Sequence, residues 1–575
     1  MCGIFGAVSK SDDVVDQAIK SLARLEYRGY DSAGIAFVNN GKIERIRKTG
    51  NTTNLSKSIK KDEHQSSIVI GHTRWATHGQ VNETNAHPHF AYNNELVGVH
   101  NGIIENAALL KDTLLENKIP IYSETDSEIA ISYIAYLSQE KGLLTALKLA
   151  HLHIIGSYAI ALLDNKTKQI FIITNERQVV IGKSANGFLI ASDEYALLPF
   201  CQQIAYPCEN EIIRICEDSY ECILGDKPHL KAIEYEPEDY PANNFMLREI
   251  QEQPHIFARQ SVMANKPVKI ENIEKLHFVA CGTSYHAALV AKNWFLANTP
   301  FDITVEHASE YRYTKRHVDK KTALIVLSQS GETADTLNAL RSVKEKIGIT
   351  IGVCNITTST IAREVDHVIS LDAGREFGVA STKAFTSQLV RLAQLLSSIS
   401  SFPPVNFSSL IELSKFALEQ KTIDQFAKTI SKYENALFIG RLSGYPLAME
   451  AALKLKEITY IHAEAYPAGE LKHGPIALID ESMPTIALVS QFHQPNKTLS
   501  NIEEIRSRGG LVFILTDQQS VLNRLPGIYI PRCKTEIDFA VASSILLQRL
   551  AHSVCTIREL DPDRPRNLAK SVTVE

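Results

Sequence analysis

Residues 323–333 read Ala-Leu-Ile-Val-Leu-Ser-Gln-Ser-Gly-Glu-Thr, and an amphipathic stretch follows them through Lys346. The first five residues are continuously apolar, as in a strand that is buried on both faces of a sheet. The small polar residues after them are typical of a loop that joins such a strand to a helix. This order indicates a βα unit of a parallel, doubly wound sheet.

The same kind of unit occurs on either side of this stretch. Upstream, an apolar run leads into Cys281-Gly-Thr-Ser-Tyr and a helical pattern through Asn298; a second series begins after Gly440. We predict further strands at Leu276–Ala280, Thr350–Cys354, His367–Ser370, Ala436–Ile439, Thr485–Val489 and Gly510–Leu515. The sequence therefore predicts two tandem α/β domains, at residues 251–402 and 403–575, which meet at Pro403-Pro404.

The first part of the chain has short strands separated by polar residues. We predict strands at Ile4–Val8, Gly34–Asn39, Lys42–Lys48, Ser67–His72, Leu96–Asn101, Tyr158–Asp164 and Gln169–Thr174. Helical patterns lie between them, at Val14–Leu25, Ala107–Lys118 and Ser127–Glu140. This arrangement is typical of an α+β domain with antiparallel strands. We assign it to residues 2–235, with a charged, proline-containing linker at residues 236–250.

Composition excludes several classes of protein. Of 575 residues 44% are hydrophobic and 22% charged, and 60 basic against 65 acidic residues give a net charge of −5. Such a balance does not favour wholesale binding to nucleic acid or to anionic membranes. The uncharged stretch Leu392–Ile411 contains six serines and two prolines, so we expect a helix end and a linker there, not a membrane span.

The nine cysteines have no CxxC spacing and the N-terminus has no signal-peptide pattern, so we expect a protein of the reducing cytoplasm. Cys2 is the most distinctive of them. Removal of the initiator Met, which a small second residue permits, would place its thiol beside its own α-amine. An amine with a pKa of about 7.7–8.0 can act as a base near neutrality. On position alone, a buried structural cysteine in an N-terminal strand is the more common interpretation.

Polar residues after the predicted strands give Cys2 a different context. Arg74 can hold a carboxylate in a bidentate contact, and Asp126 can pair with an ammonium. The Asn101 amide and the Gly102 N–H can donate hydrogen bonds to an oxyanion. These are the groups needed to bind a free amino acid and to attack its side-chain amide.

Taken in order, six strings resemble the glutaminase domain of the class II, N-terminal-nucleophile amidotransferases over residues 2 to about 220. The strings are CGIFG (2–6), LEYRGYDSAG (25–34), HTRWATHG (72–79), NAHPH (85–89), HNGIIEN (100–106) and ETDSE (124–128). The resemblance implies an αββα domain with Cys2 as the nucleophile and Asn101 and Gly102 as the oxyanion hole. It implies that glutamine is bound by Arg74, Trp75, Thr77, His78, His87 and Asp126. The His pairs 87/89 and 151/153 lack further ligands at metal-site spacing, so we expect no metal.

Two features of the second part indicate a site for a phosphorylated polar ligand. Hydroxyls and free N–H groups of residues 328–333 would meet an anion at a helix N-terminus, and Thr283-Ser284 repeat the arrangement. Ordinary helix capping would explain either loop alone. Glu450, Lys454 and Glu457 share one helix face, which in isolation is more often a solvated salt-bridge face.

The second part of the chain contains five further strings: CGTSYHA (281–287), SQSGET (328–333), ALKLKE (452–457), EAYPAGELKHGP (464–475) and RPRNLAKSVTVE (564–575). Together they resemble the paired sugar-isomerase (SIS) domains of the glutamine:fructose-6-phosphate amidotransferases. The resemblance implies that the sugar phosphate is bound by Thr283, Ser284, Ser328, Gln329, Ser330, Thr333, Val379 and Ser381. It implies a proton shuttle at Glu457, ring opening at His473 and a Schiff base at Lys570, supported by Lys454 and Glu450.

The same resemblance implies a complete activity. Ammonia from L-glutamine would pass through a closed channel, with Trp75 at its mouth, to D-fructose 6-phosphate. The product would be D-glucosamine 6-phosphate, at the first step of amino-sugar nucleotide synthesis, with no cofactor. His473 would come from a partner subunit, so we expect a homodimer. The short segment between the halves is typical of bacterial members.

Three rival functions lack their sequence features. Amidophosphoribosyltransferases need an acidic loop for phosphoribosyl pyrophosphate, and asparagine synthetases need an SGGxDS loop; neither string is present. Regulators with tandem SIS domains carry a basic helix-turn-helix domain, which residues 1–240 do not resemble.

Overall fold

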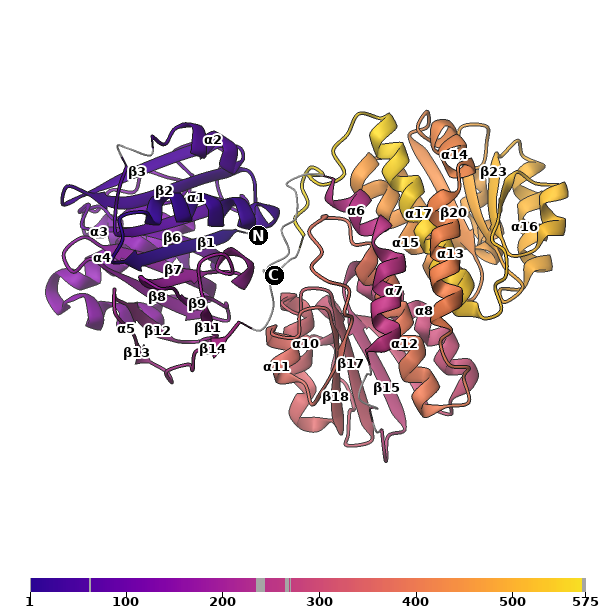
Figure 1. Ribbon diagram of the computed structural model, residues 1–575, viewed down its shortest axis with the longest axis horizontal. Helices are drawn as coiled ribbons and strands as arrows, with labels where there is room; N and C mark the ends of the chain where they lie inside the picture. The colour runs from indigo at the N-terminus through magenta and orange to yellow at the C-terminus, as the bar shows by residue number, and fades with distance from the viewer. Residues whose placement is uncertain (1, 61–63, 234–243, 264–267, 269, 571–575) are drawn as a thin grey trace. The chain divides into compact units, whose positions relative to one another are not determined.

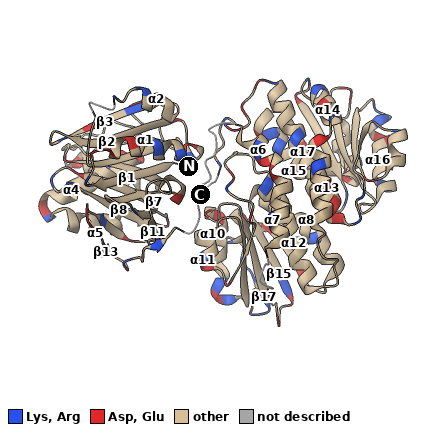
Figure 2. Cartoon of the chain, viewed as in Figure 1, with Lys and Arg blue, Asp and Glu red and all other residues tan. Residues whose placement is uncertain are grey.

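The computed structural model describes residues 2–60, 64–233, 244–263, 268 and 270–570. The chain divides into two compact units, Met1–Asp239 and Tyr240–Ser571 (Figure 1). Most of the expected linker, residues 236–243, lies outside the described residues. Its last residues, from Phe245 onward, form the start of helix α6 (Phe245–Gln251). Basic and acidic residues are interspersed in both units (Figure 2), in line with their near balance in the sequence.

The first unit contains two antiparallel sheets. The larger follows the order β14 (Lys231–Ala232), β11 (Gln203–Ala205), β9 (Val180–Lys183), β10 (Gly187–Ala191), β1 (Gly3–Ser9), β4 (Ile68–Arg74), β2 (Ser32–Asn39), β3 (Lys42–Thr49). The smaller follows the order β13 (Tyr220–Leu224), β12 (Ile212–Ile215), β8 (Gln169–Asn175), β7 (Gly156–Asp164), β6 (Leu96–Ile104), β5 (His89–Phe90).

Three apolar cores hold this unit in four layers. One core lies between the sheets and contains Ile4, Val99 and Ile172. A second joins the outer face of the larger sheet to α1 (Val14–Leu25) and α2 (Thr52–Lys57). The third joins the smaller sheet to α3 (Ala107–Glu116), α4 (Asp126–Lys141) and α5 (Leu143–His153). This helix–sheet–sheet–helix arrangement confirms the predicted αββα domain.

The second unit contains two parallel five-stranded sheets with one topology. The first has the order β16 (Asp302–His307), β15 (Lys275–Ala280), β17 (Thr322–Ser328), β18 (Ile349–Cys354), β19 (His367–Ser370). The second has the order β21 (His462–Pro467), β20 (Asn435–Gly440), β22 (Thr485–Val489), β23 (Val512–Thr516), β24 (Gly527–Tyr529). Two doubly wound domains are thereby confirmed. In each, the strand order reverses beside the first strand, which opens a crevice at the carboxyl ends of the strands.

Helices cover both sheets and share one core. They are α7 (Gln253–Val262), α8 (Gly282–Asn298), α9 (Ala308–Tyr311), α10 (Ala334–Val343), α11 (Thr360–Glu364), α12 (Lys383–Ile399), α13 (Phe407–Glu419), α14 (Thr422–Ile430), α15 (Gly444–Thr459), α16 (Pro495–Arg506) and α17 (Glu536–Ile557). Trp294 of α8, Leu455 of α15 and Leu546 of α17 belong to a single cluster. Helix α17 is long and apolar enough to cross a membrane, but most of it is buried in this core.

Candidate active sites

A pocket in the first unit opens beside Cys2. It encloses about 250 Å³ of empty space, part of it open to solvent. Its walls come from the start of β1, the end of β4, the middle of β6 and the start of α4. The lining residues are Cys2, Arg74, Trp75, Thr77, His78, His87, His100, Gly102, Thr125, Asp126 and Ser127. The fold thus gathers around one cavity the residues expected to bind glutamine.

The Cys2 thiol is fixed by its neighbours. Its Sγ accepts a hydrogen bond from the Trp75 backbone N–H at 3.2 Å, and its carbonyl oxygen accepts from Arg28 Nε at 3.2 Å and Asn101 Nδ2 at 3.0 Å. Burial raises the pKa of the Cys2 thiol, although nearby positive charges, including Arg74, oppose the rise. The thiol is therefore neutral near pH 7 and needs a base to become a nucleophile.

Asn101 is oriented by a buried histidine. His72 Nε2 lies 2.9 Å from the carbonyl oxygen of His100 and 3.1 Å from Asn101 Oδ1. Because a carbonyl oxygen can only accept, this nitrogen must carry the proton, so Asn101 Oδ1 accepts and Nδ2 faces Cys2. Gly102 has φ +127°, and a Cβ there would lie 2.0 Å from the Ser157 carbonyl oxygen, so only glycine fits.

Arg74 and Asp126 lie at element ends that point into the pocket. Arg74, the last residue of β4, is 3% exposed and donates to the carbonyl oxygens of His78 and Gln80, the latter at 3.3 Å. Asp126 begins α4, and its Oδ2 accepts from the Ile104 N–H at 2.9 Å. The guanidinium thus shapes the 78–80 loop as well as the pocket wall.

In the second unit, the expected phosphate-binding loop follows β17. Ser328 Oγ accepts from the Gly331 N–H at 2.9 Å and lies 3.0 Å from Thr333 Oγ1, and Ser330 Oγ accepts from the Glu332 N–H at 3.1 Å. Ser284, after the neighbouring strand β15, accepts from Gln388 Nε2 at 2.8 Å. Both loops therefore lie at the carboxyl ends of the two strands that flank the crevice.

The cluster on α15 is buried and not solvated, so the surface salt-bridge interpretation is wrong. Lys454 is 2% exposed, and its Nζ lies 2.5 Å from Glu457 Oε2 and 3.6 Å from Glu450 Oε1. Burial alone would lower the pKa of Lys454, but the two carboxylates raise it above its ordinary value. Glu450 also accepts from Thr283 Oγ1 at 3.0 Å, which connects the cluster to the β15 loop.

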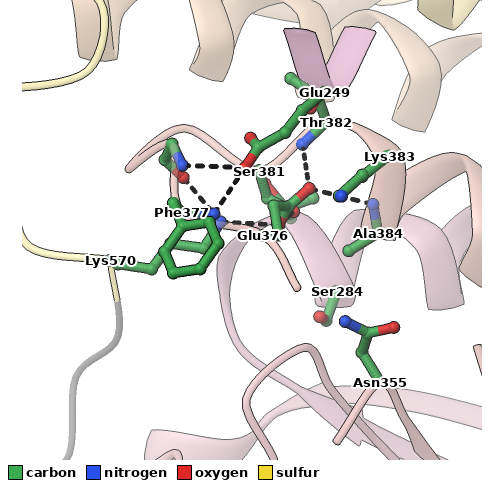
Figure 3. A network of polar contacts seen from close by, with 12 residues as sticks. Glu249, Ser284, Asn355, Glu376, Phe377, Ser381, Thr382, Lys383, Ala384 and Lys570 are labelled. Carbon is green, nitrogen blue, oxygen red and sulfur yellow. Dashed lines mark hydrogen bonds and ion pairs between the residues drawn. The ribbon is translucent and has the colours of Figure 1, made fainter. Parts of the chain in front are cut away.

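Lys570, in the C-terminal segment, reaches the first α/β domain at Glu376 and Gly378. Its Nζ lies 2.6 Å from Glu376 Oε2 and donates to the Gly378 carbonyl oxygen at 2.7 Å (Figure 3). Ser381 Oγ donates to the same Glu376 oxygen at 2.9 Å. The expected sugar contacts Val379 and Ser381 thus lie in the segment that holds Lys570.

His473, at the end of the 3-10 helix Ala468–His473, is exposed, and no hydrogen bond joins it to Lys454 or Glu457 in the described part of the chain.

Comparisons with known proteins agree with this architecture. Residues 72–199 match the glutamine amidotransferase domain, and residues 269–398 and 429–558 each match the SIS domain. Glutamine–fructose-6-phosphate aminotransferase (isomerizing) of Shewanella oneidensis is 38% identical over 613 residues, and that of Yersinia pseudotuberculosis is 39% identical over 617 residues; each alignment covers 100% of both chains. The chain belongs to this family of isomerizing aminotransferases. The C-terminal domain of glucosamine-fructose-6-phosphate aminotransferase from Francisella tularensis has a TM-score of 0.52 at 37% identity and covers 56% of this chain and 98% of that chain.

The two SIS domains differ at their crevices. In the second domain, Ser443 Oγ lies 2.7 Å from His493 Nε2, which in turn lies 3.1 Å from Glu536 Oε1. Ser443 and His493 are buried, and they follow β20 and β22, the counterparts of β15 and β17. These side chains fill the position where the first domain presents its hydroxyl loops, so the first domain is the better candidate for sugar binding.

Sequence reasoning predicted His87 as a pocket residue but missed its neighbours His72 and His100, and it missed a second group of residues altogether. His72, His87, His89 and His100 form a buried cluster, with the rings of His72 and His87 centred 4.1 Å apart. Burial lowers the pKa of His72 to about 3 and that of His87 well below its ordinary value. Among the described residues, no three or more His, Cys, Asp or Glu side chains, these histidines included, form a group that could hold a metal ion. The second missed group contains Glu249 and Glu376, which belong to no string quoted above.

Proposed function

We propose that the chain hydrolyses L-glutamine at Cys2 and transfers the ammonia to D-fructose 6-phosphate, forming D-glucosamine 6-phosphate and L-glutamate. One observation carries this proposal: a single chain holds a half-buried thiol in a polar pocket and a buried Lys–Glu cluster beside the hydroxyl loops of a SIS domain. Relatives whose name includes both glutamine and fructose 6-phosphate align with the full length of this chain.

In the first reaction the Cys2 thiol attacks the side-chain amide of glutamine. Its own α-amine, free once Met1 is removed, takes the thiol proton and later gives it to the leaving ammonia. Asn101 Nδ2 and the Gly102 N–H stabilise the oxyanion. Arg74 and Asp126 bind the carboxylate and the ammonium of the amino acid, and Trp75, Thr77, His78 and His87 complete the pocket.

In the second reaction the hydroxyls of the 328–333 loop bind the sugar phosphate, together with Gln329, Thr283 and Ser284. Lys570 forms a Schiff base at C2 of the open-chain ketose. Glu457 moves a proton between C1 and C2, and Lys454, 2.5 Å away, holds that carboxylate in place. A partner subunit supplies His473 for ring opening, which makes the active form a homodimer.

The two reactions are coupled by transfer of neutral ammonia away from bulk water, where it would mostly be protonated near pH 7. Trp75 lines the glutamine pocket and packs edge-to-face on Tyr30, with ring centroids 5.7 Å apart, which suits a residue that closes one end of the passage. We place the enzyme in the cytoplasm, at the entry to amino-sugar nucleotide synthesis.

One assay separates this function from its rivals. Glutamate release from glutamine is measured with and without fructose 6-phosphate, and glucosamine 6-phosphate is quantified in the same samples. We expect glucosamine 6-phosphate only when both substrates are present, and a faster release of glutamate with the sugar. Glutamate release that is indifferent to the sugar, with no amino sugar formed, would contradict the proposal.

A further inference from the structure

Glu376 divides its carboxylate between two tasks. Its Oε1 accepts from the backbone N–H groups of Thr382 at 2.9 Å and Ala384 at 3.0 Å, at the start of α12. Its Oε2 accepts from Lys570 Nζ at 2.6 Å and from Ser381 Oγ at 2.9 Å (Figure 3). One oxygen therefore caps a helix, while the other meets the amine expected to react with the sugar.

The contact between Glu376 and Lys570 is a buried ion pair. The Glu376 side chain is fully buried and that of Lys570 is 3% exposed. Burial alone would raise the pKa of Glu376, but the Lys570 ammonium and the N–H donors hold it at about 2. In the free protein the pair is thus an ion pair, and an ammonium has no lone pair with which to attack a carbonyl.

A second buried carboxyl, that of Glu249 on α6, faces the same loop. Its Oε1 accepts from the N–H groups of Phe377 and Gly378, the former at 2.5 Å, and its Oε2 has no hydrogen-bond partner among the described residues. Burial, followed by the Glu376 charge, raises the pKa of Glu249 to about 8. Near pH 7 Glu249 is therefore neutral, and one anion faces one cation.

We propose that Glu376 is both the anchor and the proton acceptor of Lys570, and that sugar binding at Ser381 triggers the transfer. This inference rests on the proposed function, because it gives Lys570 its Schiff-base role. Other titratable groups around Glu376 are the carboxyl of Glu249 on α6 and the amines of Lys454 on α15 and Lys383 on α12. Lys383 pairs with Glu252 at 2.8 Å.

The transfer is balanced in atoms and charge. A sugar that takes the Ser381 hydroxyl removes one of the two side-chain donors from Glu376 Oε2, which makes that oxygen more basic. One proton then passes from the Lys570 ammonium to Oε2 and leaves a neutral amine beside a neutral carboxylic acid. The amine adds to C2 of the ketose and passes one of its two hydrogens to the C2 oxygen. Glu376 returns the proton it accepted to the same oxygen, which leaves as water, so that a protonated Schiff base remains beside the Glu376 carboxylate.

Glu376→Gln separates the two tasks. The amide oxygen can still accept from Thr382 and Ala384, so the cap of α12 is retained, whereas the amide nitrogen would face Lys570 as a second donor. The matched control is Glu364→Gln, which breaks the ion pair with Arg341 Nε, at 3.1 Å, in the same domain. Melting temperatures and glutamine hydrolysis of both variants report whether the protein remains folded.

The readout is reduction of the Schiff base by borohydride in the presence of fructose 6-phosphate, followed as mass added to Lys570. At pH 7 we expect Glu376→Gln to trap sugar about 100-fold more slowly than wild type, the size of effect typical for a lost proton acceptor. Its rate should rise about tenfold per pH unit, because hydroxide must then remove the proton, whereas the wild-type rate should change less. Glu376→Asp, which keeps the charge, should recover part of the loss.

Trapping by Glu376→Gln at the wild-type rate, or with the wild-type pH profile, would overturn the inference. So would an equal loss in Glu364→Gln. If wild type itself traps no sugar, the proposed function fails, and this inference falls with it; that outcome is distinguishable because it does not depend on the variant.

Discussion

The thiol of Cys2 and the backbone of Trp75 contact each other twice: the Trp75 N–H lies 3.2 Å from Sγ, and Sγ lies 3.4 Å from the Trp75 carbonyl oxygen. Cys2, the proposed nucleophile, is therefore held by Trp75. Trp75 directly follows Arg74, the residue proposed to bind the carboxylate of glutamine. This double contact fixes the thiol at the pocket wall without a salt bridge. Its consequences can be tested at each of the three residues.

Cys2→Ser should abolish glutamine hydrolysis, because a hydroxyl is a much weaker nucleophile when activated by an amine of ordinary pKa. Isomerisation of fructose 6-phosphate should persist, since its residues lie in the other unit. Glutamate release and ketose–aldose conversion are measured on the same preparation. Cys208→Ser, at an exposed cysteine, is the matched control and should retain both activities. Normal hydrolysis by Cys2→Ser would mean that another residue is the nucleophile.

Arg74→Ala should raise the KM for glutamine about 30-fold, equivalent to about 2 kcal/mol, because a charged contact is lost and its partner is left unpaired. Arg47→Ala controls for damage to the adjacent segment, since Arg47 Nη1 donates to the carbonyl oxygens of Thr84 and Ala86 at 3.0 and 2.8 Å without lining the pocket. Equal KM values in both variants would remove Arg74 from the binding site.

The buried histidines should make the first unit sensitive to acid. The pKa of His72 is about 3 in the folded protein against about 6.5 unfolded, so the unfolded state binds more protons between these values. Above pH 6.5 His72 is neutral in both states and does not affect the free energy of unfolding. Below pH 6.5 protonation favours the unfolded state, and His72 alone would lower the free energy of unfolding by about 3 kcal/mol at pH 4. The neighbouring histidines act in the same direction.

Tryptophan fluorescence can follow this loss in the intact chain. The sequence has two tryptophans, Trp75 and Trp294, so Trp294→Phe leaves a reporter in the first unit and Trp75→Phe leaves one in the second. We expect the melting temperature reported by Trp75 to fall steadily from pH 6.5 to pH 4. A constant value over that range would mean that the histidines do not titrate on unfolding.

Sequence patterns predicted the strands and helices that bury one clear face. The strands His367–Ser370 and Thr485–Val489 and the helix Val14–Leu25 have the bounds that the sequence predicts. The edge strand β16 was missed because it contains the charged residues Asp302 and Glu306 and buries only Ile303 fully, so it has no continuous apolar run. The short strands of the segment 180–232 were missed because strands of two to five residues have too little periodicity to recognise.

Local strings predicted the residues of the candidate glutamine pocket because five of the six strings quoted for the first unit contribute residues to its wall. Glu376 and Glu249 escaped for a physical reason. Glu376 meets Lys570 across 194 positions, and Glu249 meets Phe377 across 128 positions, so neither pairing leaves a local pattern. Single-sequence reasoning finds side chains that act within a motif, and misses those that act between distant segments.

Trp75→Ala should uncouple the two reactions. Loss of the indole opens one wall of the pocket to water, so ammonia would escape and become protonated before it reaches the sugar. We expect glutamine hydrolysis to continue while glucosamine 6-phosphate per glutamate falls well below one. Trp75→Phe, which keeps an aromatic ring, should lie between the two. If Trp75→Ala still gives one product per glutamate, Trp75 does not close the passage and is packing for the glutaminase domain.

The central claim is that the amide nitrogen of glutamine becomes the amine of the sugar without leaving the enzyme. Glutamine labelled with ¹⁵N at the amide is supplied with fructose 6-phosphate and an excess of unlabelled ammonium, and the glucosamine 6-phosphate is analysed by mass spectrometry. The account predicts that the product carries ¹⁵N and that one glutamate accompanies each amino sugar. Product with unlabelled nitrogen, or glutamate without amino sugar, would contradict it.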